Sequence, residues 1–135
     1  MSAARIVSKE SKIDLTESNG GVYYIHAIID NLETNMLLDT GSKYVVLSKN
    51  TFNRIKSIHS MMPIKTISGM NANGSVGSYQ VYKVNDLTLG ACELHDIEVV
   101  YMPKSTRDIL GLSVLRSMSP FTVNIDKSLL TVNCG

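Results

Sequence analysis

The amino-acid sequence predicts an all-β domain that forms a small closed barrel of a single lobe, with one or two short helices. Runs rich in β-branched and aromatic residues recur along the 135 residues, and Gly, Asn, Asp and Pro residues separate them. Two segments at most have helical character, and no repeat or low-complexity linker divides the chain. Many short strands joined by turns are typical of barrels, so one all-β domain is expected.

The first third of the chain contains a polar start and a hairpin. Residues 1–12 are expected to be a flexible N-terminal segment, so the folded domain is predicted to span residues 13–135. Val22–Ile29 has the composition of a strand, and Asp30-Asn31-Leu32-Glu33 after it is typical of a turn. This strand and the run that ends at Asp39 are therefore predicted to pair.

Two segments are candidates for short helices. Ser48 can cap the first helix, and the spacing of Phe52, Ile55 and Ile58 predicts that all three lie on one buried face. The second candidate is Leu112–Met118, which ends before a proline.

The remaining segments are predicted strands. Pro63–Met70 and Val76–Leu89 should form a hairpin whose tip is Asn71-Ala72-Asn73-Gly74. Apolar residues mark another strand at 94–100, and residues 121–132 close the chain as a last hairpin.

The composition excludes several classes of function. The chain is 44% hydrophobic and 19% charged, as expected for an ordinary globular protein, and its net charge is +1. It has no long basic cluster and no Trp, so we expect no nucleic-acid partner. It has no apolar run of membrane-spanning length and no signal peptide, so we expect no membrane insertion by this chain.

The cysteines and histidines do not suggest a metal or cofactor site. Cys92 and Cys134 are expected to be two free thiols, because nothing else in the chain needs a covalent link; one bridge between them is the alternative. The histidines are isolated and have no ligand spacing with either cysteine, so no metal and no cofactor are predicted. They are His26, His59 and His95.

The most informative stretch is Met36-Leu37-Leu38-Asp39-Thr40-Gly41-Ser42. Three apolar residues lead into a carboxylate, which is costly at the end of a buried strand unless it is hydrogen-bonded or paired. Gly41 permits a sharp turn and leaves its N–H accessible, and the neighbouring hydroxyls can donate hydrogen bonds. The stretch therefore favours one acid held at the mouth of the core.

This motif and a second one downstream resemble the retropepsin-like aspartic proteases. Asp39-Thr40-Gly41-Ser42 is followed far along the chain by Ile109-Leu110-Gly111, with a glycine-tipped hairpin between them. Ile13-Asp14-Leu15 and Asn19-Gly20 are similar to the lead-in of the bacterial single-domain branch. The resemblance covers roughly residues 13–132 and implies the retropepsin-like barrel.

The resemblance also implies roles for individual residues. Asp39 would be the catalytic acid, Thr40 would brace the loop across a dimer, and Ser42 would donate a hydrogen bond to Asp39. The residues expected to support the active-site loop are Thr40, Gly41, Ser42, Ile109, Leu110 and Gly111. The hairpin would act as the flap over the substrate, through Ser68, Gly69, Met70, Asn71, Ala72, Asn73 and Gly74. No aromatic residue lies at its tip, although Tyr79 follows a few residues later.

Aspartic-protease chemistry needs two carboxylates, and the chain has one Asp-Thr-Gly. The second acid must then be Asp39 of another copy, so the resemblance implies a symmetric homodimer that hydrolyses peptide bonds. An alternative is a retropepsin-like dimerisation or peptide-binding module with little catalysis, and a third reading is a small β-barrel binding protein with an accidental motif. The substrate sequence, the pH optimum, the stability of the dimer without ligand and the compartment do not follow from the sequence. The chain fits either a cytoplasmic protein or a periplasmic domain released from an anchor.

Overall fold

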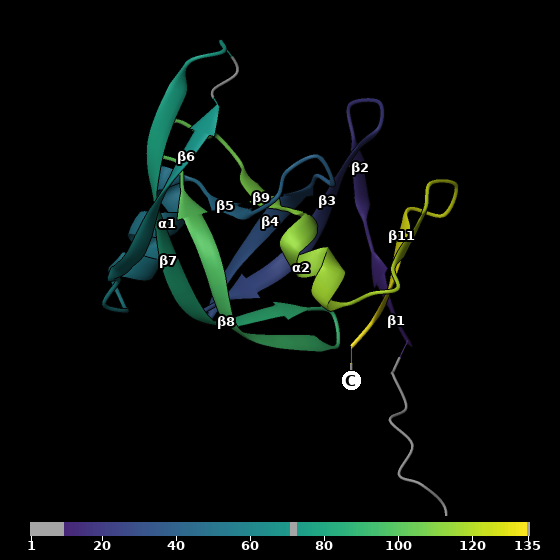
Figure 1. Cartoon of the computed structure of the whole chain (residues 1–135). Coiled ribbons are helices and arrows are strands. Elements are labelled where there is room, and N and C mark those ends of the chain that lie inside the picture. Colours follow the sequence, from purple (N-terminus) through teal and green to yellow (C-terminus); the bar gives the residue numbers. More distant parts are fainter. Residues whose placement is uncertain (1–9, 71–72, 135) are drawn as a thin grey trace, which may run out of the picture.

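The computed structural model describes residues 10–70 and 73–134 (Figure 1), and in these residues the chain forms eleven strands and two helices. The strands are β1 Glu10–Asp14, β2 Thr16–Ser18, β3 Val22–Ile29, β4 Leu32–Leu38, β5 Val45–Leu47, β6 Pro63–Met70, β7 Val76–Leu89, β8 Cys92–Tyr101, β9 Asp108–Leu110, β10 Thr122–Asn124 and β11 Leu129–Asn133. The helices are α1 Lys49–Lys56 and α2 Leu112–Ser117. The predicted all-β class with two short helices is confirmed.

Eight strands form one sheet in the order β2-β3-β4-β9-β5-β8-β7-β6. β3 also pairs with β7, through Ile28 with Thr88 and Ile29 with Leu87, so that six of these strands close into a barrel. β6 and the first half of β7 extend beyond the closed part, and this hairpin projects from the barrel in Figure 1.

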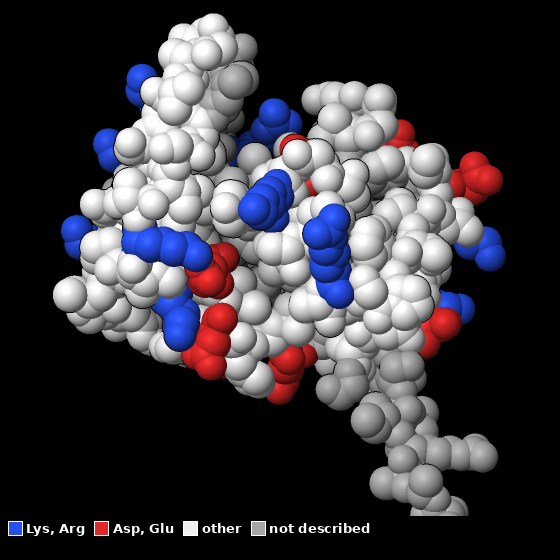
Figure 2. Space-filling model, in the orientation of Figure 1, with Lys and Arg blue, Asp and Glu red and all other residues white. Residues whose placement is uncertain are grey.

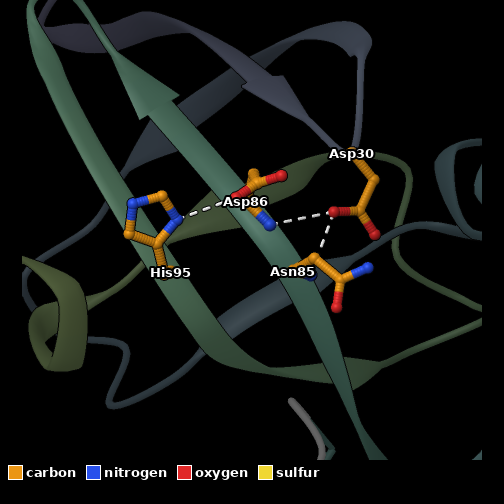
Figure 3. A network of polar contacts seen from close by, with 4 residues as sticks. All are labelled: Asp30, Asn85, Asp86 and His95. Atoms are coloured by element: carbon orange, nitrogen blue, oxygen red, sulfur yellow. Dashed lines mark hydrogen bonds and ion pairs between the residues drawn. The ribbon is translucent and has the colours of Figure 1, made fainter.

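A buried aspartate holds the closure of the barrel (Figure 3). Asp30 lies in the turn after β3 and is 4% exposed, and its Oδ1 accepts hydrogen bonds from the backbone N–H groups of Asn85 and Asp86, both at 2.9 Å. The Asp86 carboxylate in turn lies 2.8 Å from Nδ1 of His95, in an exposed pair. The Asp30 carboxylate therefore fastens the β3–β4 turn to the middle of β7.

The two ends of the described chain meet in a second sheet of order β1-β11-β10. Glu10 already pairs with Asn133, so the ordered strand begins three residues before the predicted domain start at Ile13. The rest of the predicted flexible segment, residues 1–9, lies outside the described residues.

The expectation of two free thiols was wrong. Cys92 and Cys134 form a disulfide, with Cα atoms 5.7 Å apart, that links the start of β8 to the end of β11. The two cysteines are 42 residues apart, and the pairing of the C-terminal strand with β1 brings them together.

Both helices were predicted, with one error. Ser48 caps α1, where its side chain accepts the N–H of Thr51, and Phe52 and Ile55 are buried as expected. Ile58 lies beyond the end of α1 and is 56% exposed, so its predicted place on the buried face was wrong. The core lies inside the barrel, where its fully buried residues include Ile25, Met36 and Leu110. Neither helix approaches the length or apolarity of a membrane span.

Candidate active site

Asp39 leaves the barrel where β4 ends beside β9. The two strands are parallel, with Leu37 opposite Ile109 and Leu38 opposite Leu110, and the N–H of Asp39 donates to the carbonyl oxygen of Leu110 at 3.1 Å. Since side chains alternate along a strand, the Asp39 side chain leaves the sheet on the same face as Leu37 and Ile109. Asp39 is half-buried, and Thr40 and Gly41 after it are exposed.

The backbone of the loop organises the Asp39 carboxylate. The N–H of Gly41 donates to Oδ1 of Asp39 at 2.9 Å, and a Cβ added at Gly41 would lie 3.1 Å from the same oxygen. The N–H of Ser42 donates to the carbonyl oxygen of Asp39 at 3.1 Å. One oxygen of the carboxylate therefore has a fixed donor within its own turn.

The role expected of the Ser42 side chain differs from the one found. Its hydroxyl donates to the carbonyl oxygen of Tyr44 at 3.1 Å and not to Asp39. Ser42 is bonded to Asp39 only through its backbone N–H, while its side chain tightens the next turn of the loop.

Gly111 lies directly against this loop. A Cβ at Gly111 would lie 2.1 Å from the carbonyl oxygen of Tyr44 and 2.7 Å from that of Ser42, and neither backbone atom can move away independently. The N–H groups that follow Gly111 hold the same segment, because Leu112 donates to Ser42 at 2.7 Å and Ser113 donates to Lys43 at 3.0 Å. The two sequence motifs are therefore brought into contact, as the resemblance implied.

A strip of apolar side chains connects Asp39 to the hairpin. Cross-strand partners share a face of the sheet, and the pairs run from Leu37 to Ile109, to Val46, to Val100 and to Val81. The three valines are buried, yet they are not members of the main core. We call this row the Asp39 strip, and it lies on the face of these strands that is turned away from the main core.

The hairpin places an aromatic ring at the end of the Asp39 strip. Tyr79 lies two residues from Val81 on β7, opposite Ile67, and its ring lies over the paired glycines Gly69 and Gly77. A Cβ at either glycine would lie 3.1–3.2 Å from atoms of this ring. Sequence reasoning noted Tyr79 only as a residue beyond the tip, because the register that directs its ring back over the glycines is not visible in the sequence.

The structure describes part of the tip of the β6–β7 hairpin. Asn73 Oδ1 accepts hydrogen bonds from the backbone and the hydroxyl of Ser75, and Gly74 has a φ of +86°, which favours glycine. Asn71 and Ala72, which were predicted to belong to the flap, lie outside the described residues.

An open groove of about 980 Å³ lies between the hairpin and the loop that follows β8. Tyr79 and Tyr82 line it from β7, and Tyr101, Met102 and Lys104 line it from the other side. Phe52 supports this aromatic floor, since its ring stacks on Tyr101 at 4.0 Å and lies 4.8 Å from Tyr82.

A second, smaller groove of about 380 Å³ lies beside the loop, between Lys43 and α2. It contains an ion pair of 2.7 Å between Lys65 and Glu98, and the hydrogen bond to Glu98 raises the pKa of the Lys65 ammonium above its ordinary value.

Asp108 is a buried acid whose role the sequence did not reveal. It is 5% exposed and accepts three hydrogen bonds, from the backbone N–H of Ser48 at 2.8 Å and from the hydroxyls of Thr34 and Thr51. It lies opposite Met36, on the core face, so it cannot meet Asp39. The signal was available, because an acid stands directly before the apolar pair of the Ile-Leu-Gly motif.

The arrangement suits acid–base chemistry by a half-exposed carboxylate next to an apolar surface. In the described residues no group of three His, Cys, Asp or Glu side chains is placed to hold a metal ion. Two aspartates are buried, and their carboxylates accept structural hydrogen bonds: Asp30 through Oδ1, and Asp108 through both oxygens.

Comparisons with known proteins agree with this geometry. The model of a family described as "gag-polyprotein putative aspartyl protease" matches residues 25–117. The fold matches the crystal structure of a retropepsin-like aspartic protease from Rickettsia conorii with a TM-score of 0.71 and 18% sequence identity, covering 98% of each chain. A search of curated proteins by sequence gave no match.

Proposed function

Because the chain belongs to this gag-polyprotein aspartyl protease family and has the retropepsin-like fold, we propose that it is a homodimeric aspartic endopeptidase. In this proposal two subunits each contribute Asp39, and the two carboxylates activate one water molecule that attacks a peptide bond.

The observation that carries the proposal is the environment of Asp39. Its carboxylate is oriented by the Gly41 N–H at the end of an apolar strip, while Thr40 and Gly41 beside it are exposed. Asp30 and Asp108, the other buried acids, are committed to structure, so a second acid at this position would have to come from a second chain. A symmetric dimer with its axis beside Asp39 supplies it.

The chemistry follows from the closeness of the two acids. Two carboxylates a few ångströms apart cannot both ionise at low cost, so the pair holds one proton between them. The ionised acid takes a proton from the water as its oxygen attacks the amide carbon. The protonated acid donates its proton to the carbonyl oxygen, which gives a tetrahedral intermediate. The C–N bond then breaks as the carbonyl re-forms and returns that proton to the acid pair, and the proton taken from the water passes to the leaving nitrogen.

The substrate in this proposal is a peptide in extended form. It would lie between the Asp39 strip and the β6–β7 hairpin, where apolar side chains can be buried on Ile109 and Tyr79. Closure of the hairpin over the peptide would exclude water from the two acids.

The experiment that tests the proposal is the substitution Asp39→Asn, assayed on a denatured protein substrate. Asparagine keeps the shape of the side chain but cannot take the proton from water, and the symmetry of the dimer removes both acids with one substitution. The loss should therefore exceed the ~10²–10⁴-fold usually assigned to one acid–base group.

The matched control is Asp126→Asn, an exposed position in the last turn. It should keep the wild-type rate. Cleavage by Asp39→Asn at the wild-type rate would place the active site elsewhere, and a wild-type protein that binds peptides without cutting them would favour a binding module instead.

A further inference from the structure

We propose that Arg107 selects substrates that carry an acidic side chain within a few residues of the bond to be cut. This inference rests on the proposed peptidase function and adds a specificity residue to it. Arg107 lies in the loop that joins β8 to β9 and directly precedes β9.

The register of β9 puts Arg107 on the same face as Asp39. Ile109 pairs with Leu37 on the Asp39 strip, and Arg107 is two residues before Ile109, so the alternation of side chains directs both to this face. A hydrogen bond agrees with this placement: Nη1 of Arg107 lies 3.4 Å from the hydroxyl of Tyr24, and Tyr24 pairs with Leu37 on the neighbouring strand.

The backbone at Arg107 is held in place by its own loop. Ser105 Oγ donates to the carbonyl oxygen of Arg107 at 2.6 Å and accepts its N–H at 3.4 Å, and the N–H of Ser105 donates to Met102 at 3.0 Å. Arg107 therefore follows an organised turn, residues 102–105, that lines the groove between the hairpin and this loop, and its own side chain is exposed.

The charges around this position favour an acidic ligand. Arg107 has no carboxylate within ion-pair distance in the part of the chain that the structure describes. Lys104 on the same loop adds a second positive charge, and no acidic side chain lines the adjoining groove. Two other acids share this face: Glu98, which pairs with Lys65 at 2.7 Å, and Glu33 on β4, whose carboxylate lies 3.4 Å from Nε2 of His26.

The surface view is consistent with this distribution. Figure 2 shows basic side chains on and around the projecting hairpin, whereas the acidic side chains of that view lie mostly below it or to its right. A carboxylate on an extended peptide under the hairpin would meet a positive field at this edge, and a guanidinium can bind it through two parallel N–H donors.

The parallel register of β4 and β9 also gives the distance between Arg107 and Asp39, and so the substrate positions that Arg107 can contact. Asp39 follows the Leu38–Leu110 pair, so Arg107 lies about four residue steps away, or ~13 Å along the strands. An extended peptide advances ~3.3 Å per residue, so a substrate side chain within about four positions of the scissile bond can reach the Arg107 guanidinium. In a symmetric dimer Arg107 occurs at both ends of the cleft, so acidic residues should be favoured on either side of the scissile bond.

The test is a mixture of synthetic peptides in which each position near the scissile bond carries Glu, Gln or Lys, read by mass spectrometry as relative kcat/KM. Wild type should prefer Glu over Gln at one or more positions by about two- to fivefold, a size appropriate to an exposed ion pair, and added salt should reduce the preference. Arg107→Glu should transfer the preference to Lys, and Arg107→Lys should retain it.

The control is Arg54→Glu, because Arg54 on α1 is also exposed and makes one hydrogen bond, of 3.4 Å, to the backbone carbonyl oxygen of Glu33. It should leave the Glu preference unchanged. The same peptides are also captured on immobilised protein, so that selection is measured without turnover. Capture of Glu peptides without cleavage would reject the proposed function and support this inference. Cleavage with equal use of Glu, Gln and Lys would overturn the inference and leave the proposed function intact, whereas equal capture of the three peptides without cleavage would overturn both.

Discussion

At the scale of single residues, three aspartates lie at the ends of strands and differ in their surroundings: Asp30 and Asp39 follow β3 and β4, and Asp108 begins β9. Asp30 and Asp108 are almost completely buried and accept two and three hydrogen bonds, respectively, from the protein. Asp39 is half-buried, and one donor, Gly41, orients one of its oxygens. A carboxylate that must exchange protons needs this incomplete coordination, whereas a structural one is stabilised by full coordination.

We expect Asp108→Ala to destabilise the fold strongly. It leaves the Ser48 N–H and the hydroxyls of Thr34 and Thr51 without their acceptor inside the protein, and each buried unsatisfied donor costs ~1–3 kcal/mol. The free energy of unfolding should fall by about 2–4 kcal/mol in urea titrations. Asp126→Ala, at an exposed turn, should change it by less than ~0.5 kcal/mol. Equal free energies of unfolding for the two variants would show that the Asp108 hydrogen bonds do not stabilise the fold.

At the scale of elements, the sequence predicted the long strands well and the short ones poorly. The bounds of β3, β6 and β7 agree with the prediction, because turn residues delimit them and their β-forming residues are numerous. β2 and β9 have three residues each, which is too few for a pattern, and their pairing depends on partners far along the chain.

The sequence likewise predicted some features of the candidate site and missed others. The two motifs around Asp39 and Gly111 were visible because glycine and a charged residue interrupt apolar runs. The direction of the Ser42 hydroxyl, the position of the Tyr79 ring and the shared face of Asp39 and Arg107 depend on register and loop geometry. Sequence patterns do not contain this information without the fold.

The β6–β7 hairpin leads to a prediction about Tyr79. Its ring covers the Gly69–Gly77 pair, where the sheet has no side chains of its own, and an aromatic ring in this position stabilises a glycine-containing hairpin. Tyr79→Ala should increase hydrogen exchange of β6 and the first half of β7, and it should raise KM more than it lowers kcat. Tyr79→Phe keeps the ring over the glycines and should lie closer to wild type than Tyr79→Ala in both measurements. Unchanged hydrogen exchange and an unchanged KM in Tyr79→Ala would contradict a role of Tyr79 in the proposed closure of the hairpin over substrate.

At the scale of the whole molecule, the disulfide joins the barrel to the sheet formed by the chain ends. Cys92 and Cys134 are 42 residues apart in the sequence. A disulfide that closes a loop of this length stabilises the fold by up to ~4 kcal/mol, because it lowers the conformational entropy of the unfolded chain. Cys92→Ser with Cys134→Ser should therefore lower the melting temperature. Catalysis below the new transition should persist, because neither cysteine belongs to the Asp39 strip. An alkylating reagent without a reductant should have no effect, and a variant as stable as wild type would contradict the contribution of the bridge.

The sharpest prediction at this scale tests the proposal that two subunits share one active site. When wild-type chains are mixed with Asp39→Asn chains and allowed to exchange, mixed dimers hold one acid and should be inactive. Random pairing of an equal mixture should reduce the activity per wild-type chain to about one half, and a ninefold excess of the variant should reduce it to about one tenth. Mixing with Asp126→Asn should leave the activity per wild-type chain unchanged, because that residue lies in an exposed turn outside the Asp39 loop. Sedimentation at the assay concentration should show dimers in every mixture, with weak dimers detected once peptide is added. Activity that stays proportional to the wild-type chains at every ratio would mean that one chain carries a complete active site, and the shared pair of Asp39 residues would be excluded.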